Sequence, residues 1–331
     1  MQTERRHTNP RQPPAGELAQ RIKLYYSDTF ELPLPAGHKF PMAKYRLLRD
    51  RIADSALMAS CDLEIAPAAD DQQLELVHSG DYIRRVVRGE LSAVDQRRIG
   101  FPWSPAMVER ARRSVGATIA AAASALERGF AASLAGGTHH AFADSGQGYC
   151  VFNDCCVAAR WVQRQGLARR VAIVDLDVHQ GNGSAAIAAD DPNLFTFSIH
   201  CAANFPFRKS ASKFDLELPA GTTDGPYLAA LEQALAPAFE RFAPDLVLYV
   251  SGADPFADDR FGKLKLSKPG LVARDRTVYE YFRTMGIPVA ATMAGGYARR
   301  IEDLVEIHFG TIASGADVFA SGRGRRLLAA R

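Results

Sequence analysis

Apolar residues in this chain fall into short runs that alternate with longer stretches of helical periodicity. A short continuous apolar run between turn residues is typical of a parallel strand that is buried on both faces. Such runs predict strands at residues 24–26, 131–135, 171–174, 195–199, 246–250 and 289–293.

Between these runs, apolar residues recur with the spacing of amphipathic helices. The pattern predicts helices at residues 106–128, 157–165, 227–242, 268–285 and 301–314. Ser104 followed by Pro105 marks the start of the first helix, and Gly129 marks its end. Asp224 is the expected N-cap of the third helix. This alternation predicts an α/β fold in which helices cover both faces of a doubly wound, mostly parallel sheet.

The 331 residues are 47% hydrophobic and 23% charged, which is the ordinary balance of a globular protein with a large core. No linker rich in Ser, Gly or Pro divides the chain, so we expect a single domain over residues 21–320. We expect the polar residues 1–20 to be a disordered tail and the arginine-rich residues 321–331 to be a basic C-terminal tail.

Charge and cysteine content exclude several classes of function. Lysine and arginine number 40 against 37 acids, and a net charge of +3 gives no broad field for binding nucleic acid. The N-terminal segment has no apolar core, so it predicts neither a secretory signal nor membrane attachment. Five cysteines without metal-finger spacing fit a reducing cytoplasm. No coiled-coil heptad indicates an oligomeric state.

Polar side chains gather where the predicted strands end. In an open parallel sheet, ligands bind outside the carboxyl ends of the strands. One predicted strand is followed by the sequence GGTHH, the next by Asp175, Asp177 and His179, and the last two by Asp254 and by Gly-Gly-Tyr297. We therefore expect a single site at this edge.

Asp177 and His179 are two residues apart, so an extended backbone turns both side chains to the same face. With Asp254 they supply two carboxylates and an imidazole, which leaves a coordination position open for water and substrate. The glycines on either side of Asn182 predict backbone that bends tightly around a ligand. The set predicts a catalytic zinc ion, and Fe(II) is also compatible with it.

A hydrolytic metal site also needs groups that move protons and stabilise an oxyanion. His139 and His140 are the candidate acid and base, and Asp175 is placed to orient one imidazole through its Nδ1–H. Tyr297 follows two glycines that allow close approach to a substrate, so it is the candidate oxyanion donor.

Together these motifs resemble the histone deacetylase family over residues 24–319, in an order that is highly specific. They are Gly-Gly-Thr-His139-His140, the stretch DLDVHQGNG that begins at Asp175, Ala253-Asp254 and Gly295-Gly296-Tyr297. The DLDVHQGNG and GQGYC stretches and the short chain are most similar to the class IV branch and its bacterial members. The resemblance implies an arginase/deacetylase fold, a zinc ion and hydrolysis of acyl-lysine or similar acylated amines.

The resemblance also implies roles for individual residues. Asp177, His179 and Asp254 match the zinc ligands. His140 matches the general base, His139 its neighbour held by Asp175, and Tyr297 the transition-state tyrosine. Asn182 stands where one branch of the family has an aspartate, so His140 is expected to have a neutral partner and to remain a neutral base.

Two further sets come from the resemblance alone. A structural potassium site is implied at Asp175, Asp177, His179, Ser198 and Ile199. A narrow channel for the substrate is implied at Gly148, Tyr149, Phe205, Phe261 and Gly296. Near Gly100-Phe101-Pro102 no acid stands where many eukaryotic members have a substrate-gripping aspartate, which weakens the case for a protein substrate.

Three other interpretations of the same residues remain. An acetylpolyamine amidohydrolase, or another deacetylase of small-molecule amides, shares the core chemistry, although the segment before Ser104 is short and holds few acids to bind a polyamine. An arginase-like enzyme with two manganese ions needs more carboxylates. An inactive acyl-lysine binder predicts a missing ligand or tyrosine, and neither is missing. The preferred acyl group is left open because loop packing sets its pocket.

Overall fold

Eight parallel strands form one sheet in the computed structural model, which describes residues 21–320. The strands are β1 (Ile22–Tyr26), β2 (Cys61–Ile65), β3 (Phe130–Ser133), β4 (Val171–Asp175), β5 (Leu194–Cys201), β6 (Phe214–Leu218), β7 (Leu246–Val250) and β8 (Val289–Thr292). Their order in the sheet is β2-β1-β3-β8-β7-β4-β5-β6. The predicted α/β fold is confirmed, and the tails at residues 1–20 and 321–331 lie outside the described residues.

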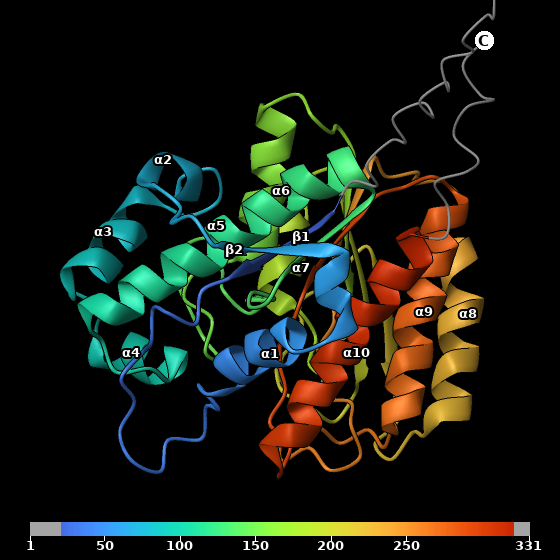
Figure 1. Ribbon diagram of the computed structural model, residues 1–331. Coiled ribbons are helices and arrows are strands. Elements are labelled where there is room, and N and C mark those ends of the chain that lie inside the picture. Colours follow the sequence, from blue (N-terminus) through green and yellow to red (C-terminus); the bar gives the residue numbers. More distant parts are fainter. Residues whose placement is uncertain (1–20, 321–331) are drawn as a thin grey trace, which may run out of the picture.

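Helices pack on both faces of this sheet, as Figure 1 shows. The helices are α1 (Lys44–Ala53), α2 (Asp71–Leu74), α3 (Gly80–Arg88), α4 (Ala93–Ile99), α5 (Pro105–Arg128), α6 (Asp154–Arg164), α7 (Asn182–Ala188), α8 (Asp224–Phe239), α9 (Lys268–Thr284) and α10 (Ile301–Ala320), with a short 3₁₀ turn at Ala56–Ala59. Helices α1, α8, α9 and α10 share one hydrophobic core, and α3, α5 and α6 share a second.

The central strands divide their side chains between these two cores. In β4, Ala172 and Val174 face the first core, whereas Val171 and Ile173 face the second. Both sets are apolar because helices cover both faces, and this explains why the strand is a continuous apolar run. A central strand with both faces buried holds the residues at its end rigidly.

The structure adds two strands that the apolar pattern does not predict. They are β2 and β6, at the two edges of the sheet. Their sequences, CDLEI and FDLEL, mix charged and apolar residues because an outer strand is only partly covered. The short helices α1, α3 and α4 are not among the predicted elements either. Helix α3 nevertheless carries a helical pattern, with Tyr82, Ile83 and Val86 on its buried face.

The expected helix cap at Asp224 is wrong. Asp224 is the first residue of α8, and its carboxylate accepts hydrogen bonds from the Ser267 backbone N–H (2.8 Å) and hydroxyl (2.5 Å). Ser267 itself caps α9 through the Gly270 N–H. Asp224 therefore joins the starts of two neighbouring helices instead of capping its own.

Over residues 21–320, no helix has the length and apolar character needed to cross a membrane.

A buried histidine makes the stability of this fold depend on pH. His78 is 2% exposed, and its Nε2 accepts a hydrogen bond from the Asn153 N–H (2.9 Å) at the start of α6. Burial lowers the pKa of His78 to about 4. Its contribution to stability is therefore complete above the unfolded-state pKa of about 6.5 and is lost as the pH falls toward 4.

We predict that the wild type loses about 2 to 3 kcal/mol more unfolding free energy than His78→Gln between pH 7.5 and pH 4.5. The carboxylates titrate in both proteins, so their contribution cancels in the comparison. Urea unfolding at both pH values measures the difference. Parallel pH dependences for the two proteins would exclude a buried neutral His78.

Candidate active site

Four adjacent strands at the centre of the sheet, β3, β8, β7 and β4, bring the predicted site residues together. The GGTHH segment follows β3, and residues 295–297 follow β8. Asp254 follows β7, and Asp177 and His179 follow β4. Because all the strands are parallel, these segments meet at one edge.

Asp177, His179 and Asp254 form a cluster whose potential ligand atoms lie within 4.8 Å of one another. Nδ1 of His179 is 3.0 Å from Oδ1 of Asp177 and 3.2 Å from Oδ2 of Asp254. The two aspartates are 1% and 0% exposed, and Asp254 Oδ2 accepts no hydrogen bond. Two buried carboxylates that face one another are costly without a cation between them. The donor set fits a divalent ion with mixed nitrogen and oxygen ligands.

Backbone N–H groups fix the orientation of these carboxylates. The Val178 N–H donates to Asp254 Oδ1, and the Gly295 N–H donates to Asp177 Oδ2, each at 2.9 Å. The His179 N–H donates to Asp177 Oδ1 at 2.9 Å. Residues from three strand ends therefore hold one another in place before any ion binds.

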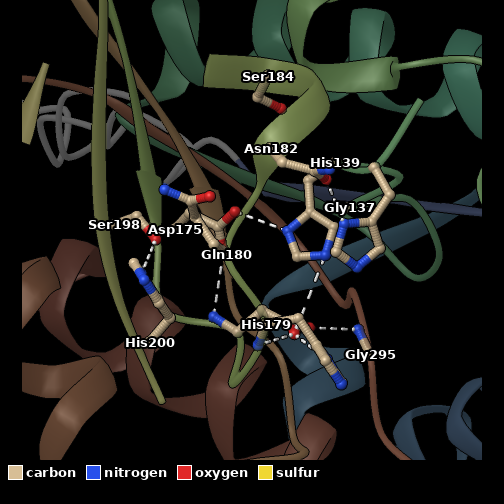
Figure 2. Close-up of polar contacts among 12 residues, drawn as sticks. Gly137, His139, Asp175, His179, Gln180, Asn182, Ser184, Ser198, His200 and Gly295 are labelled. Carbon is tan, nitrogen blue, oxygen red and sulfur yellow. Dashed lines mark hydrogen bonds and ion pairs between the residues drawn. The ribbon is translucent and has the colours of Figure 1, made fainter. Parts of the chain in front are cut away.

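The adjacent histidines have different partners. Nδ1 of His139 donates to Oδ2 of Asp175 (Figure 2), and the two atoms are 2.6 Å apart. Nδ1 of His140 donates to Oδ1 of Asn182 at 2.8 Å. An amide oxygen only accepts hydrogen bonds, so the proton of a neutral His140 sits on Nδ1. Its Nε2 is left with a free lone pair.

These partners separate the two pKa values. Burial acts to lower the pKa of His139, but the carboxylates of Asp175 and Asp177 outweigh it and raise the pKa to about 9. Burial holds the pKa of His140 well below its ordinary value, and the neighbouring His139 and His179 lower it further. At neutral pH His140 is therefore a proton acceptor.

A cavity of about 400 Å³ is lined by this cluster, by exposed residues such as Phe207 and Arg260, and by buried ones. Its inner end is the part lined by the buried Tyr45, Arg110 and Ser114. Of the predicted channel residues, Gly148, Tyr149, Phe205 and Phe261 line the cavity. Tyr297 also lines it, with its ring 4.8 Å from that of Phe261 and 6.0 Å from that of Tyr149.

Gly296 lies between Gly295 and Tyr297, which both line this cavity. A Cβ atom at Gly296 would be 2.4 Å from Leu304 of α10 and 3.0 Å from Ala253, so no side chain fits there. Its φ of 148° allows the backbone to pass close to α10. Its expected contact with substrate stays a prediction.

The residues of the expected potassium site lie on β4, the loop after it and β5. Asp175 and Ser198 are direct partners across these two strands. Figure 2 shows the hydrogen bond between the Ser198 hydroxyl and Nδ1 of His200. The two atoms are 2.9 Å apart, and Ile199 is fully buried beside Ser198.

Comparison with known proteins identifies the family. The model of the histone deacetylase domain matches residues 38–312. The chain belongs to the histone deacetylase family. The family implies deacetylase or amidohydrolase activity and is generally metal-dependent.

Plant and bacterial relatives are similar over most of their length. An uncharacterized protein of Picosynechococcus is 45% identical, covering 86% of this chain and 95% of the relative. Histone deacetylase 2 of Arabidopsis thaliana is 30% identical, covering 86% and 78%. The histone deacetylase-like amidohydrolase of Pseudomonas aeruginosa is 31% identical, covering 80% and 74%.

A solved structure agrees with the fold of this deacetylase family member. The crystal structure of the HDA15 HD domain superposes with a TM-score of 0.73 at 19% identity, covering 90% of this chain and 94% of that one.

Two acids that support the site in this deacetylase family member are missing from the sequence-based set. Asp154 is fully buried and accepts hydrogen bonds from the Gly137 and Thr138 N–H groups, which fixes the turn before His139. Asp259 accepts from the Tyr297 N–H at 2.6 Å. Each holds a loop that is remote in sequence, so no local motif marks it.

A buried lysine supports the same loops. The Lys44 ammonium, on α1, donates to the carbonyl of Ala294 at 3.0 Å and is 2% exposed. Ala294 has a φ of 48°, which is unusual for a residue with a side chain, so this bond stabilises a strained turn directly before Gly295.

The backbone bends at Gly181, where the Asn182 N–H donates to the Gln180 carbonyl at 2.8 Å around a φ of −73° and a ψ of 65°, which is an inverse γ-turn. Gly183 lies within α7. That this bend surrounds a ligand stays a prediction. These positions are glycine because of close packing. A Cβ atom at Gly181 would be 2.4 Å from Oδ2 of Asp175 and 3.2 Å from Cβ of His139. A side chain there would push apart the pair that orients His139.

We predict that Gly181→Ala lowers the unfolding free energy by about 1 to 3 kcal/mol, the usual cost of overpacking a tight site. Gly225→Ala is the control, because a Cβ atom there has no neighbour within 4 Å. It should change stability by less than about 0.5 kcal/mol. Urea unfolding at pH 7.5 compares the two. Equal stabilities for both variants would show that the site tolerates a side chain at position 181.

Proposed function

We propose that this protein is a zinc-dependent deacylase that hydrolyses the amide bond between an acyl group and the side-chain amine of lysine. The observation that carries the proposal is the position of the neutral His140 beside the Asp177, His179 and Asp254 cluster, in one cavity with aromatic walls.

Asp177, His179 and Asp254 are the proposed zinc ligands, with Fe(II) as the other candidate ion. When bound, zinc supplies a Lewis acid that polarises the acyl carbonyl and lowers the pKa of water. A structural potassium ion is proposed at the β4–β5 side, held by Ser198, Ile199 and the segment from Asp175 to His179. It would offset the charge of the carboxylates from behind the site.

His140 is the proposed general base. Its Nε2 lone pair accepts a proton from the attacking water and later returns it to the leaving amine. Asn182 favours the neutral ring in the resting state because it offers His140 an oxygen without charge. His139, paired with Asp175, adds positive charge beside the reacting carbonyl.

Tyr297 is the proposed oxyanion donor. Its hydroxyl would donate to the carbonyl oxygen as negative charge develops there, which makes the interaction stronger in the transition state than in the substrate. Burial holds the pKa of Tyr297 well above its ordinary value, so the hydroxyl keeps its proton throughout.

The aromatic walls fit the apolar stem of a lysine side chain. Tyr149 and Phe205 line the cavity, and Phe261 contacts the ring of Tyr297. Exposed Arg260 and Lys263 also line its outer part, and they would repel a cationic polyamine. The charges therefore favour acyl-lysine in a protein or peptide, or a small acylated amine of lower positive charge, over acetylpolyamines.

A cytoplasmic location is part of the same proposal. All five cysteines are free and buried, which suits a reducing compartment.

We predict that zinc-loaded protein releases free amine from fluorogenic lysine substrates bearing acetyl, octanoyl, myristoyl or lactyl groups, and that a hydroxamate inhibits the release. His140→Ala should lower kcat by about 10² to 10⁴-fold while retaining zinc, because a general base contributes that much. Absence of turnover on every lysine substrate with zinc bound would reject the lysine deacylase, and unchanged kcat in His140→Ala would reject the base.

We predict that Asp177→Ala loses the zinc that the wild type retains after dialysis, because one of three ligands and the partner of His179 are gone. The control is Asp190→Ala, which changes an exposed aspartate after α7. Elemental analysis measures the bound metal directly. A full zinc content in Asp177→Ala would show that the ligand set is different.

A further inference from the structure

The buried inner end of the cavity contains an arginine that the proposed mechanism does not use. Arg110, on α5, is 9% exposed and lines the same cavity as Asp177, His179 and Asp254. It forms no ion pair with any carboxylate of residues 21–320. A buried guanidinium without a carboxylate partner is costly, so its retention at a cavity wall points to an anionic ligand.

The surroundings of Arg110 are aromatic and positively charged. Its guanidinium lies 5.5 Å from the ring centre of Phe40 and 4.5 Å from that of Tyr45. The ammonium of Lys44 lies 5.2 Å from the centre of the same Tyr45 ring, and likewise has no carboxylate partner among the described residues. Two cations thus lie beside one tyrosine at the inner end.

The positive charge of Lys44 and Arg110 lowers the pKa of Tyr45. Burial acts to raise the pKa of this tyrosine, but Lys44 and Arg110 outweigh burial, and the pKa lies below its ordinary value. The acids that line the cavity, Asp177 and Asp254, are the proposed metal ligands. Once a divalent ion balances them, the inner end retains the positive charge of Arg110 and Lys44.

From these contacts we infer that the inner end binds a carboxylate at the far end of the acyl chain, with Arg110 as the residue that selects it. The inference rests on the proposed deacylase and names its substrate class: lysine acylated by a dicarboxylic acid, such as a succinyl or glutaryl group. Arg110 offers the planar pair of donors that suits a carboxylate. The lysine stem occupies the outer, aromatic part of the cavity, and the acyl chain extends past the ligand cluster.

The reaction is an ordinary hydrolysis and needs no further reactant. The amide C–N bond breaks, the oxygen of water joins the acyl carbon, and the amine nitrogen gains a proton. The products are a lysine side chain with a free amine and a dicarboxylate, and Arg110 stays bound to the carboxylate that was present in the substrate from the start.

The test compares kcat/KM for glutaryl-lysine and glutaramoyl-lysine peptides, which differ only by a terminal carboxylate or carboxamide. The wild type should prefer the carboxylate by about tenfold or more, as expected for a hydrogen bond to a charged group. Arg110→Gln should abolish the preference, and Arg110→Lys should keep part of it. Arg164→Gln, an exposed arginine at the end of α6, should leave it unchanged. If a variant preparation has lost part of its folded protein or its metal, kcat/KM falls equally for both peptides. The ratio of the two kcat/KM values is then unchanged.

Several outcomes separate this inference from the proposed function. Cleavage of acetyl-lysine without a preference for glutaryl, or a preference that persists in Arg110→Gln, overturns the inference and leaves the deacylase intact. If no peptide is cleaved, the proposed deacylase activity is rejected. Calorimetric Kd values for the same two peptides then test the inference, because the wild type should bind the carboxylate more tightly and Arg110→Gln should not. The acetate released from acetyl-lysine also carries a carboxylate that Arg110 and Lys44 could bind. If acetate inhibits the enzyme only when Arg110 is present, and glutaryl-lysine is not preferred, the two cations bind the product and the inference is overturned.

Discussion

The burial of two like charges at the centre of the sheet edge is the constraint on which the site depends. Asp177 and Asp254 are removed from water and face the same nitrogen of His179. Such an arrangement is expensive unless each carboxylate is hydrogen-bonded and a cation compensates the charge. The N–H groups of Val178 and Gly295 supply the hydrogen bonds, and each comes from a different strand end. The sheet must therefore be complete before the site exists.

The sequence predicts the central strands well and the periphery poorly, for a physical reason. Strand β7 is buried on both faces, so its composition alone marks it and the predicted range is exact. Strand β6 lies at the edge and has alternating exposure, so the same rule passes over it. The site residues follow the central strands, which is why the sequence locates them even though it does not predict the whole sheet.

What the sequence could not reveal are contacts between remote loops. Asp154 and Asp259 act on backbone amides of other segments, and a backbone amide carries no sequence signal. Lys44 reaches Ala294 across 250 positions of the chain. Gly181 depends on such contacts too: its turn has a φ that other residues can adopt, and what requires glycine there is the close packing of Asp175 and His139. Spacing rules describe residues within one element, whereas these residues act between elements.

The two adjacent histidines show how such remote contacts assign chemistry. His139 and His140 are identical in type and similarly buried, so nothing intrinsic distinguishes them. The carboxylate of Asp175 stabilises the charged form of His139, whereas the amide of Asn182 gives His140 a partner of similar geometry without charge. One ring therefore holds a proton at neutral pH and the other is free to accept one. Asp175 ends a central strand and Asn182 begins α7. The segment that joins β4 to α7 therefore determines which of the two histidines is protonated at neutral pH.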